Sequence, residues 1–278
     1  MLLKTNGDIL IDSIKINFDT EGLWILNIAL AVIMFGVALS IKIDDFKLLI
    51  KKPKILLVGV FSQFFLLPAL TFVAILIIKP HPSFALGMMM IAACPGGNIS
   101  NFFSKMAKGN SALSVSLTAF ATVICLLMTP LNLQFYSGLY EPTNEIIKTV
   151  QLDPIELFKL VLLILGIPIV LGMLLNHYFE EISKKIEVLL KPFSMIVFLA
   201  LIVIAFYDNI DVFLNYIHLV AGLVIFHNIG AYCIGFYTAK IFGLEKRDRK
   251  TISMETGIQN GGLGLLLIFQ FFDGLGGM

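Results

Sequence analysis

Two stretches of the sequence indicate its fold: residues 83–107, SFALGMMMIAACPGGNISNFFSKMA, and residues 251–272, TISMETGIQNGGLGLLLIFQFF. Each is an apolar segment interrupted by helix-breaking residues. At about 1.5 Å per residue, the breaks lie about 18 Å and about 15 Å from their segment boundaries, near the middle of a ~30 Å bilayer core. Lipid cannot satisfy the backbone groups that a break frees, so both breaks must face protein or a cavity. The two segments enter from opposite sides, which predicts an inverted-repeat secondary transporter.

The composition places the chain in a membrane. Its 278 residues are 58% apolar and 14% charged, whereas soluble proteins are about 45–50% apolar and about 25% charged. The mean hydropathy is +0.92. The net charge of +1 gives no reason to expect nucleic acid as a partner. The three cysteines are too few and too scattered for a disulfide framework or a thiolate metal site. These values predict an all-α polytopic membrane protein whose partner is the lipid bilayer.

Eight stretches lack charged residues and predict eight membrane helices. A polar tail at 1–22 precedes a first repeat at 23–140, and a second repeat follows at 154–278. In the first repeat we expect helices at 23–43, 54–78, 83–107 (broken at 95–97) and 110–136. In the second we expect helices at 155–179, 190–208, 212–242 and 249–273 (broken at 259–262).

Basic residues predict the orientation of these helices. Fifteen of the 20 lysines and arginines fall in the loops on one side, mainly at 42–54, 184–191 and 240–250. Positively charged loops stay in the cytoplasm. We therefore expect a multi-pass protein of the cell (inner) membrane with both termini outside.

One carboxylate falls inside a predicted membrane helix. Glu255 lies five residues beyond Lys250, about 7–8 Å inside the membrane boundary. A charge there costs roughly 2.5 kcal/mol or more, and such residues usually carry function. The alternative is a side chain that extends back to Arg249 or Lys250. The polar run favours the functional interpretation, because it continues inward at Thr256, Gln259 and Asn260.

Further polar residues accompany the two breaks. The first break is followed by Asn98, Ser100 and Asn101, and the next helix carries Ser111, Ser114, Thr118 and Thr122 on one face. Such a face can also be a packing stripe between membrane helices. Gln63 and the pair His227 and Asn228 are single polar intrusions, for which hydrogen-bonded packing is the alternative. The available ligands are oxygen atoms, which suit Na⁺ or H⁺ rather than zinc or copper.

Four motifs resemble the bile acid:sodium symporter family. They are AACPGGNISN at 92–101, AKGN at 107–110 with ALS at 112–114, FHNIG at 226–230 and ETGIQN at 255–260. The resemblance implies two inverted five-helix repeats whose broken helices cross in a core domain beside a panel domain. Relative to that ten-helix pattern, the chain is expected to lack the first and the last helix.

The resemblance also implies two Na⁺ sites and a substrate site. The first Na⁺ site would use Ser100, Asn101, Ser114, Thr118 and Glu255. The second would use Gln63, Glu255 and Gln259, with the carbonyls of Thr256 and Ile258. The substrate site would include Asn98, Ile99, Asn260, Gly261, His227 and Asn228. The free N–H groups at the start of each half-helix would favour an anion there.

The predicted function is Na⁺-coupled symport of an organic anion by a monomer, without catalysis. One alternative is an arsenite-type or other anion efflux carrier, in which Cys94 would bind a soft oxyanion. Another is a non-transporting fragment of a symporter. An intramembrane enzyme that uses Glu255 with His227 is a further class, but no nucleophile stands in a recognisable setting.

Overall fold

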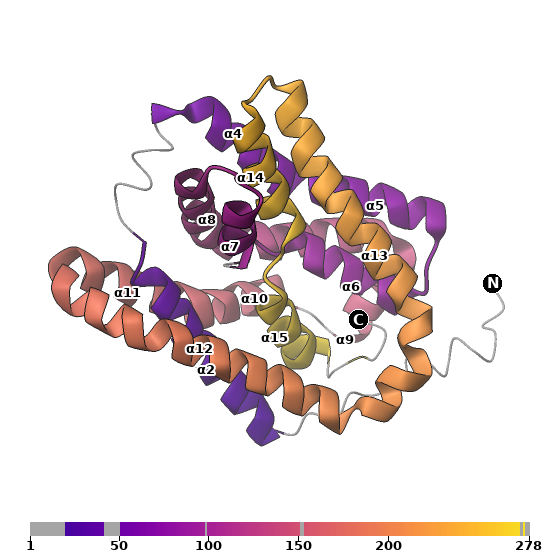
Figure 1. Cartoon of the computed structure of the whole chain (residues 1–278). Helices are drawn as coiled ribbons and strands as arrows, with labels where there is room; N and C mark the ends of the chain where they lie inside the picture. The colour runs from indigo at the N-terminus through magenta and orange to yellow at the C-terminus, as the bar shows by residue number, and fades with distance from the viewer. Residues whose placement is uncertain (1–19, 42–50, 98, 151–152, 273–274, 276–278) are drawn as a thin grey trace.

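The computed structural model describes residues 20–41, 51–97, 99–150, 153–272 and 275 (Figure 1). Within them the chain is helical and contains no strand, only isolated β-bridge residues. The first half contains α2 (Thr20–Ala38), α4 (Pro53–Phe61), η1 (Ser62–Leu66), α5 (Leu67–Ile78), α6 (Pro82–Ala93), α7 (Ile99–Met106), α8 (Ser111–Leu139) and α9 (Glu141–Val150). The second half contains α10 (Pro154–Val161), η2 (Leu162–Gly166), α11 (Ile167–Tyr178), α12 (Glu180–Asp208), α13 (Ile210–Ile241), α14 (Lys246–Gly257) and α15 (Gly261–Phe272).

Helix length and composition confirm a polytopic α-helical membrane protein. Among the described residues, four helices are long and apolar enough to cross a bilayer: Pro53–Ile78, Ser111–Leu139, Ile155–Tyr178 and Ile210–Ile241. Three shorter apolar helices, Asn27–Ala38, Pro82–Ala93 and Gly261–Phe272, accompany them. Two of these, within α6 and α15, are the apolar halves of the interrupted segments. The structure also contains α9, a helix that the search for charge-free segments did not predict.

Two long helices contain a short π-helical segment that the sequence analysis did not predict. The segment η1 joins α4 to α5, and η2 joins α10 to α11. Pro68 and Pro168 lie two residues beyond these segments. A proline lacks the N–H that would bond to the carbonyl four residues earlier. For Pro68 that carbonyl belongs to Phe64, and it accepts a hydrogen bond from Asn132 Nδ2 of α8 at 2.8 Å.

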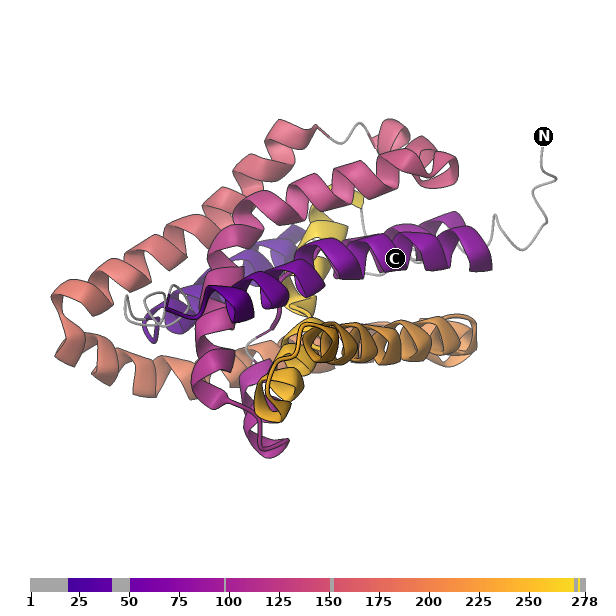
Figure 2. The same ribbon diagram turned by 90° about the horizontal axis from the view of Figure 1, so that it is seen from above.

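The helices form two packed groups. In one, α2 packs on α11 and α12, and the approach is so close that a Cβ on Gly172 would lie 2.6 Å from the Cβ of Ala38. In the other, α14 packs along α13, where a Cβ on Gly235 would lie 2.6 Å from the carbonyl oxygen of Ile252. Figure 2 shows α13 (orange) running beside the α4–α5 helix (purple) in this second group.

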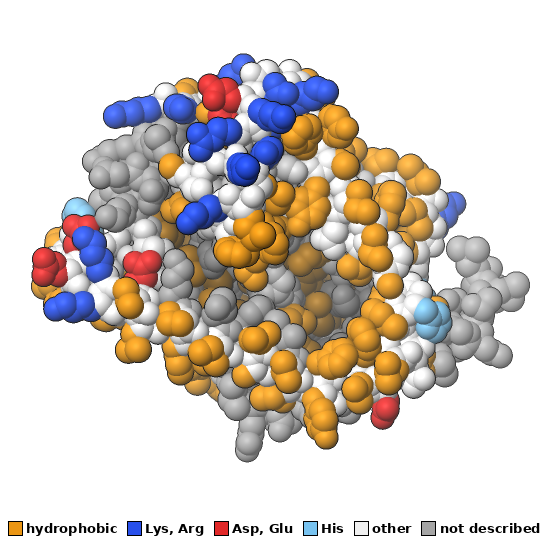
Figure 3. Space-filling view, in the orientation of Figure 1, with side chains coloured by type: hydrophobic (Ala, Val, Ile, Leu, Met, Phe, Trp, Pro, Cys, Tyr) orange, Lys and Arg blue, Asp and Glu red, His pale blue; other side chains and the backbone are white. Residues whose placement is uncertain are grey.

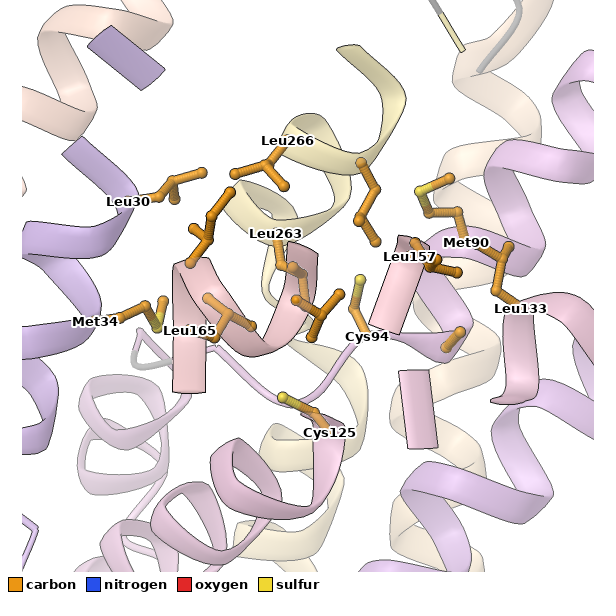
Figure 4. Packing of buried hydrophobic residues seen from close by; sticks show 14 of the residues in the cluster. Leu30, Met34, Met90, Cys94, Cys125, Leu133, Leu157, Leu165, Leu263 and Leu266 are labelled. Atoms are coloured by element: carbon orange, nitrogen blue, oxygen red, sulfur yellow. The ribbon is translucent and has the colours of Figure 1, made fainter. Parts of the chain in front are cut away.

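An apolar cluster joins the two groups. Leu30 and Met34 of α2 and Leu165 of η2 meet Leu263 and Leu266 of α15 (Figure 4). The same cluster extends to the other group through buried residues of α6 and α8. The contact positions α15 between the two groups of helices.

Charged and apolar side chains occupy different parts of the surface. In the view of Figure 3, lysines and arginines gather at the end of the molecule where α4 and α14 begin, and apolar side chains cover much of the remaining face. This is the end that the charge pattern predicts to be cytoplasmic.

Candidate functional site

The two interrupted helices meet at their breaks. The link between α6 and α7 and the link between α14 and α15 pair as an antiparallel β-bridge of Gly96 with Gln259. The N–H of Gly97 donates to the carbonyl of Ile258 at 2.7 Å, and the N–H of Asn260 donates to the carbonyl of Pro95 at 2.8 Å. Each break therefore satisfies backbone groups of the other, which lipid could not do.

Helix α8 supports the crossing from one side. The carbonyl of Ala93, at the end of α6, accepts a hydrogen bond from Thr129 Oγ1 of α8 at 2.8 Å. Asn132, one turn further along α8, holds the carbonyl of Phe64 as described above. Neither Thr129 nor Asn132 was among the predicted site residues.

The carboxylate of Glu255 is buried beside this crossing, with 3% of the residue exposed. Its Oε1 accepts hydrogen bonds from Ser100 Oγ at 2.6 Å and from Ser114 Oγ at 2.5 Å. Its Oε2 accepts a hydrogen bond from Thr118 Oγ1 at 2.8 Å. The hydroxyl of Thr118 also lies 3.3 Å from Asn101 Oδ1. The five side chains proposed for the first Na⁺ site thus form one cluster.

The alternative partners of Glu255 are engaged elsewhere. Lys250 Nζ donates to the carbonyl of Ala107 at 2.7 Å, and Arg249 Nε donates to the carbonyl of Leu244 at 2.6 Å. Within the described part of the chain, no lysine or arginine forms an ion pair with Glu255. The carboxylate is therefore held by hydroxyl groups, and the interpretation as a side chain extending to the boundary is wrong.

The residues proposed for the second Na⁺ site surround the other side of Glu255. Gln63 Nε2 donates to the carbonyl of Glu255 at 3.2 Å, and Gln259 Nε2 donates to the carbonyl of Thr256 at 2.6 Å. The Oε1 of Gln259 is buried and has no hydrogen-bond partner. A buried oxygen without a donor is unusual, and it is available as a cation ligand here.

Gly96 lies between these groups. A Cβ at this position would be 2.8 Å from Gln63 Nε2, 2.8 Å from the carbonyl oxygen of Glu255 and 3.0 Å from Glu255 Oε2. Only glycine leaves the two side chains room to converge. The chemistry of the assembled groups, which are carboxylate, hydroxyl, amide and carbonyl oxygens, suits a hard cation.

Two of the proposed substrate residues, His227 and Asn228, lie on α13. His227 Nε2 and Thr71 Oγ1 lie 2.8 Å apart, whereas Asn228 is exposed and donates to the carbonyl of Val224 of its own helix at 3.0 Å. Thr71 is eight residues beyond Gln63, about 12 Å along the helix. No described contact links His227 or Asn228 to Glu255, and their role in binding a substrate stays a prediction.

The other proposed substrate residues stand at the starts of half-helices. Ile99 is the first residue of α7 and is exposed, and Gly261 is the first residue of α15. Asn260 caps α15, because its Oδ1 accepts a hydrogen bond from the N–H of Leu263 at 3.2 Å. Asn98 lies outside the described residues.

Two further side chains belong to this region and were not predicted. Ser62 Oγ lies 3.1 Å from Thr256 Oγ1 and also donates to the carbonyl of Gly59. Thr251 lies one helical turn before Glu255 and makes the contacts described below. Its spacing of four residues from Glu255 places it on the same helix face, which is a signal present in the sequence.

The fold and the site together define a class of protein, namely a helical membrane transporter whose two broken helices cross beside a buried carboxylate. A sequence model of the Sodium Bile acid symporter family matches residues 27–216. The chain therefore belongs to this family, as its motifs had indicated.

Three relatives of this chain support this membership. An uncharacterized sodium-dependent transporter, YocS, of Bacillus subtilis is 31% identical over 90% of this chain and 75% of its own length. The probable chloroplastic sodium/metabolite cotransporter BASS1 of Arabidopsis thaliana is 28% identical over 88% of this chain and 59% of its own length. The human ileal sodium/bile acid cotransporter is 30% identical over 85% of this chain and 66% of its own length. The names of all three relatives describe sodium-dependent transport, and only that of the human protein specifies a substrate, bile acid.

Proposed function

We propose that this chain couples the inward movement of Na⁺ to uptake of an organic anion, as a monomer in the cell membrane with its N-terminus outside. The observation that carries the proposal is the Glu255 carboxylate, which is buried among hydroxyl groups and has no basic partner among the described residues. A buried charge without a counter-charge is costly. A cation that binds beside it supplies the missing charge.

The first proposed Na⁺ site consists of Glu255 with Ser100, Ser114, Thr118 and Asn101. The three hydroxyls donate to the carboxylate, and each hydroxyl oxygen keeps lone pairs for a cation. Helix α8 contributes two of them one turn apart, and α7 contributes the third. A cation bound there would connect α7, α8 and α14.

The second proposed Na⁺ site lies on the side of Gly96. Its ligands would be Gln63, Gln259, the Glu255 carboxylate and the carbonyls of Thr256 and Ile258. The unpartnered Oε1 of Gln259 supports this assignment. Both carbonyls already accept one hydrogen bond each, and each retains a second lone pair.

The charge of the proposed substrate is inferred from the two half-helices that begin at the crossing. The N-terminus of a helix carries a partial positive charge, worth about 0.3–1 kcal/mol toward an exposed anion and up to ~2 kcal/mol when partly buried. The helices α7 and α15 begin on the two sides of the bridged links. We infer an organic anion whose acid group lies near Asn98 and Asn260.

Two competing functions are less well supported. Cys94 is fully buried in the apolar cluster together with Cys125 and the leucines of α15 (Figure 4), a setting without the polar contacts that a soft oxyanion needs. Intramembrane catalysis by Glu255 with His227 lacks the contact between these two side chains. Transport of the anion that does not depend on Na⁺ would favour the efflux carrier over the symporter.

The proposed function is tested by thermal unfolding of the purified full chain in nanodiscs with Na⁺, K⁺ or choline. We expect Na⁺ to raise the unfolding temperature of the wild-type chain, E255A to abolish this response and S114A to reduce it. The matched control is T149A, since Thr149 is exposed and bonds only to its own helix. A full Na⁺ response in E255A would refute the assignment. A subsequent screen of organic anions with and without Na⁺ would identify the substrate class.

A further inference from the structure

A second polar cluster lies one helical turn before Glu255 along α14. At its centre is Thr251, a fully buried residue of α14. Its Oγ1 lies 2.9 Å from Ser104 Oγ of α7, accepts a hydrogen bond from the N–H of Asn110 at 2.8 Å and donates to the carbonyl of Asn110 at 3.2 Å. One hydroxyl group thus connects the end of α7, the turn after it and α14, which lie together in Figure 1.

The cluster has the same register as the Glu255 site. Thr251 precedes Glu255 by four residues, Ser104 follows Ser100 by four, and Asn110 precedes Ser114 by four. Each pair spans one turn of its own helix, about 5.4 Å. Helices α7 and α8 supply the hydroxyl groups and α14 supplies the Glu255 carboxylate. Thr251 therefore joins the same three helices one turn away from that site. Helix α8 begins at this junction, because the carbonyl of Asn110 accepts the N–H of Ser114 at 2.9 Å.

The turn between α7 and α8 is held against α14 by further contacts. Lys250 Nζ donates to the carbonyl of Ala107 at 2.7 Å, and Asn110 Nδ2 donates to the buried Asp248 at 2.8 Å. A Cβ on Gly109 would lie 2.7 Å from Thr251 Oγ1 and 2.8 Å from Ser104 Oγ. The junction is thus packed as closely as a glycine allows, so its geometry is fixed rather than adaptable.

We propose that Thr251 is a positioning residue for Na⁺ binding, an inference that rests on the function proposed above. By fixing α7 and the start of α8 against α14, its hydroxyl sets the separation of Ser100 and Ser114 from the Glu255 carboxylate. Ligand groups that bind selectively must be held within about 0.5 Å of their productive positions. If the junction is lost, every proposed Na⁺ ligand is still present in the chain, but the distances between these ligands are no longer fixed.

The test compares T251V with T251S at the same position and with T143V at another buried threonine. T251V keeps the shape of the side chain and removes its hydroxyl, whereas T251S restores the hydroxyl. T143V is the matched control, because Thr143 is also fully buried and also bonds to two partners, the carbonyls of Ser137 and Tyr140 in the α8–α9 region. For each full-length chain in nanodiscs, the Na⁺ and Li⁺ concentrations of half-maximal thermal stabilisation are measured.

T251V is expected to raise the half-maximal Na⁺ concentration about five- to tenfold, the effect of roughly one lost hydrogen bond. It should also change the ratio of Na⁺ to Li⁺ affinity, because the ligand spacing that separates these ions is altered. T251S should recover both values, and T143V should lower the unfolding temperature without changing either. If T251V does not fold, S104A carries the same test through the partner hydroxyl.

Three results would overturn the inference. If T251V keeps the wild-type Na⁺ affinity and Na⁺/Li⁺ ratio, while the wild-type chain responds normally to Na⁺, the role of Thr251 is refuted and the proposed function is not. An equal shift in T143V would reduce the effect to general destabilisation. Absence of any Na⁺ response in the wild-type chain would overturn the proposed function and this inference together.

Discussion

Replacing Gly96 by alanine adds one methyl group at the point where the two breaks cross. Gly96 does not have a positive φ, since Gly243 alone among the described glycines does, so alanine is permitted by the backbone. The obstacle is space. The new methyl carbon would lie 2.8 Å from Gln63 Nε2 and from the carbonyl oxygen of Glu255. The carbonyl belongs to the backbone of α14 and cannot move aside as a flexible side chain can.

The cost follows from this geometry. Overpacking a well-packed interior typically costs about 1–3 kcal/mol. The methyl group also lies 3.0 Å from Glu255 Oε2, so relief requires the carboxylate or the Gln63 amide to shift. Both belong to the proposed Na⁺ sites. We therefore expect G96A to lower the stability by about 1–3 kcal/mol and to weaken Na⁺ binding by about tenfold, which corresponds to ~1.4 kcal/mol.

The assay is thermal unfolding in nanodiscs over a series of Na⁺ concentrations, with G222A as the control. A Cβ on Gly222 meets nothing within 4 Å, and alanine at such a helical position stabilises by about 0.4–1 kcal/mol. G96A should therefore lose stability and Na⁺ affinity, while G222A should gain stability and keep its affinity. Normal Na⁺ affinity in G96A would refute the claim that this glycine sets the spacing of Gln63 and Glu255.

Three further outcomes are expected. In a background where Cys233 is replaced by serine, cysteine at Asn144 should react with an impermeant thiol reagent on intact cells and cysteine at Lys246 should not; the reverse pattern would invert the topology. N132L should cost about 1–3 kcal/mol, because it leaves the carbonyl of Phe64 unpaired, and an unchanged unfolding temperature would show that another donor replaces the amide. Replacing the acid group of a transported anion by its neutral amide should weaken binding while Na⁺ binding persists, and equal binding of acid and amide would contradict the role of the half-helix N-termini.

The breaks and the buried carboxylate were predictable because they violate the rules of a membrane segment. The Pro-Gly-Gly sequence and Glu255 are both unusual within apolar membrane segments, so the sequence alone identifies them. The face formed by Ser114 and Thr118 followed from helical periodicity alone. For these residues, local chemistry and helix geometry were enough to place them near one another.

Other features depended on contacts between distant segments. His227 is as unusual in its helix as Glu255, but its partner Thr71 lies on another helix, and periodicity does not reveal such a pairing. The π-helical segment η1 precedes Pro68, whose missing N–H leaves the carbonyl of Phe64 to a donor from another helix, Asn132. Helix α9 was not predicted because it contains charged residues and therefore is not a charge-free segment. Its Ile146 and Ile147 nevertheless pack on the main apolar cluster.

The crossing of the two breaks has a consequence for biosynthesis. Ser100 and Glu255 are 155 residues apart in the chain, so at 5–20 residues per second roughly 8–30 s pass between their emergence from the ribosome. During that interval the hydroxyls of α7 and α8 have no carboxylate, and the backbone at Gly96 has no bridging partner. Until α14 and α15 enter the membrane, the break between α6 and α7 lacks the backbone partners that it has in the fold. A quality-control system that recognises exposed polar backbone in the membrane would therefore recognise this chain as incompletely folded before α14 and α15 insert.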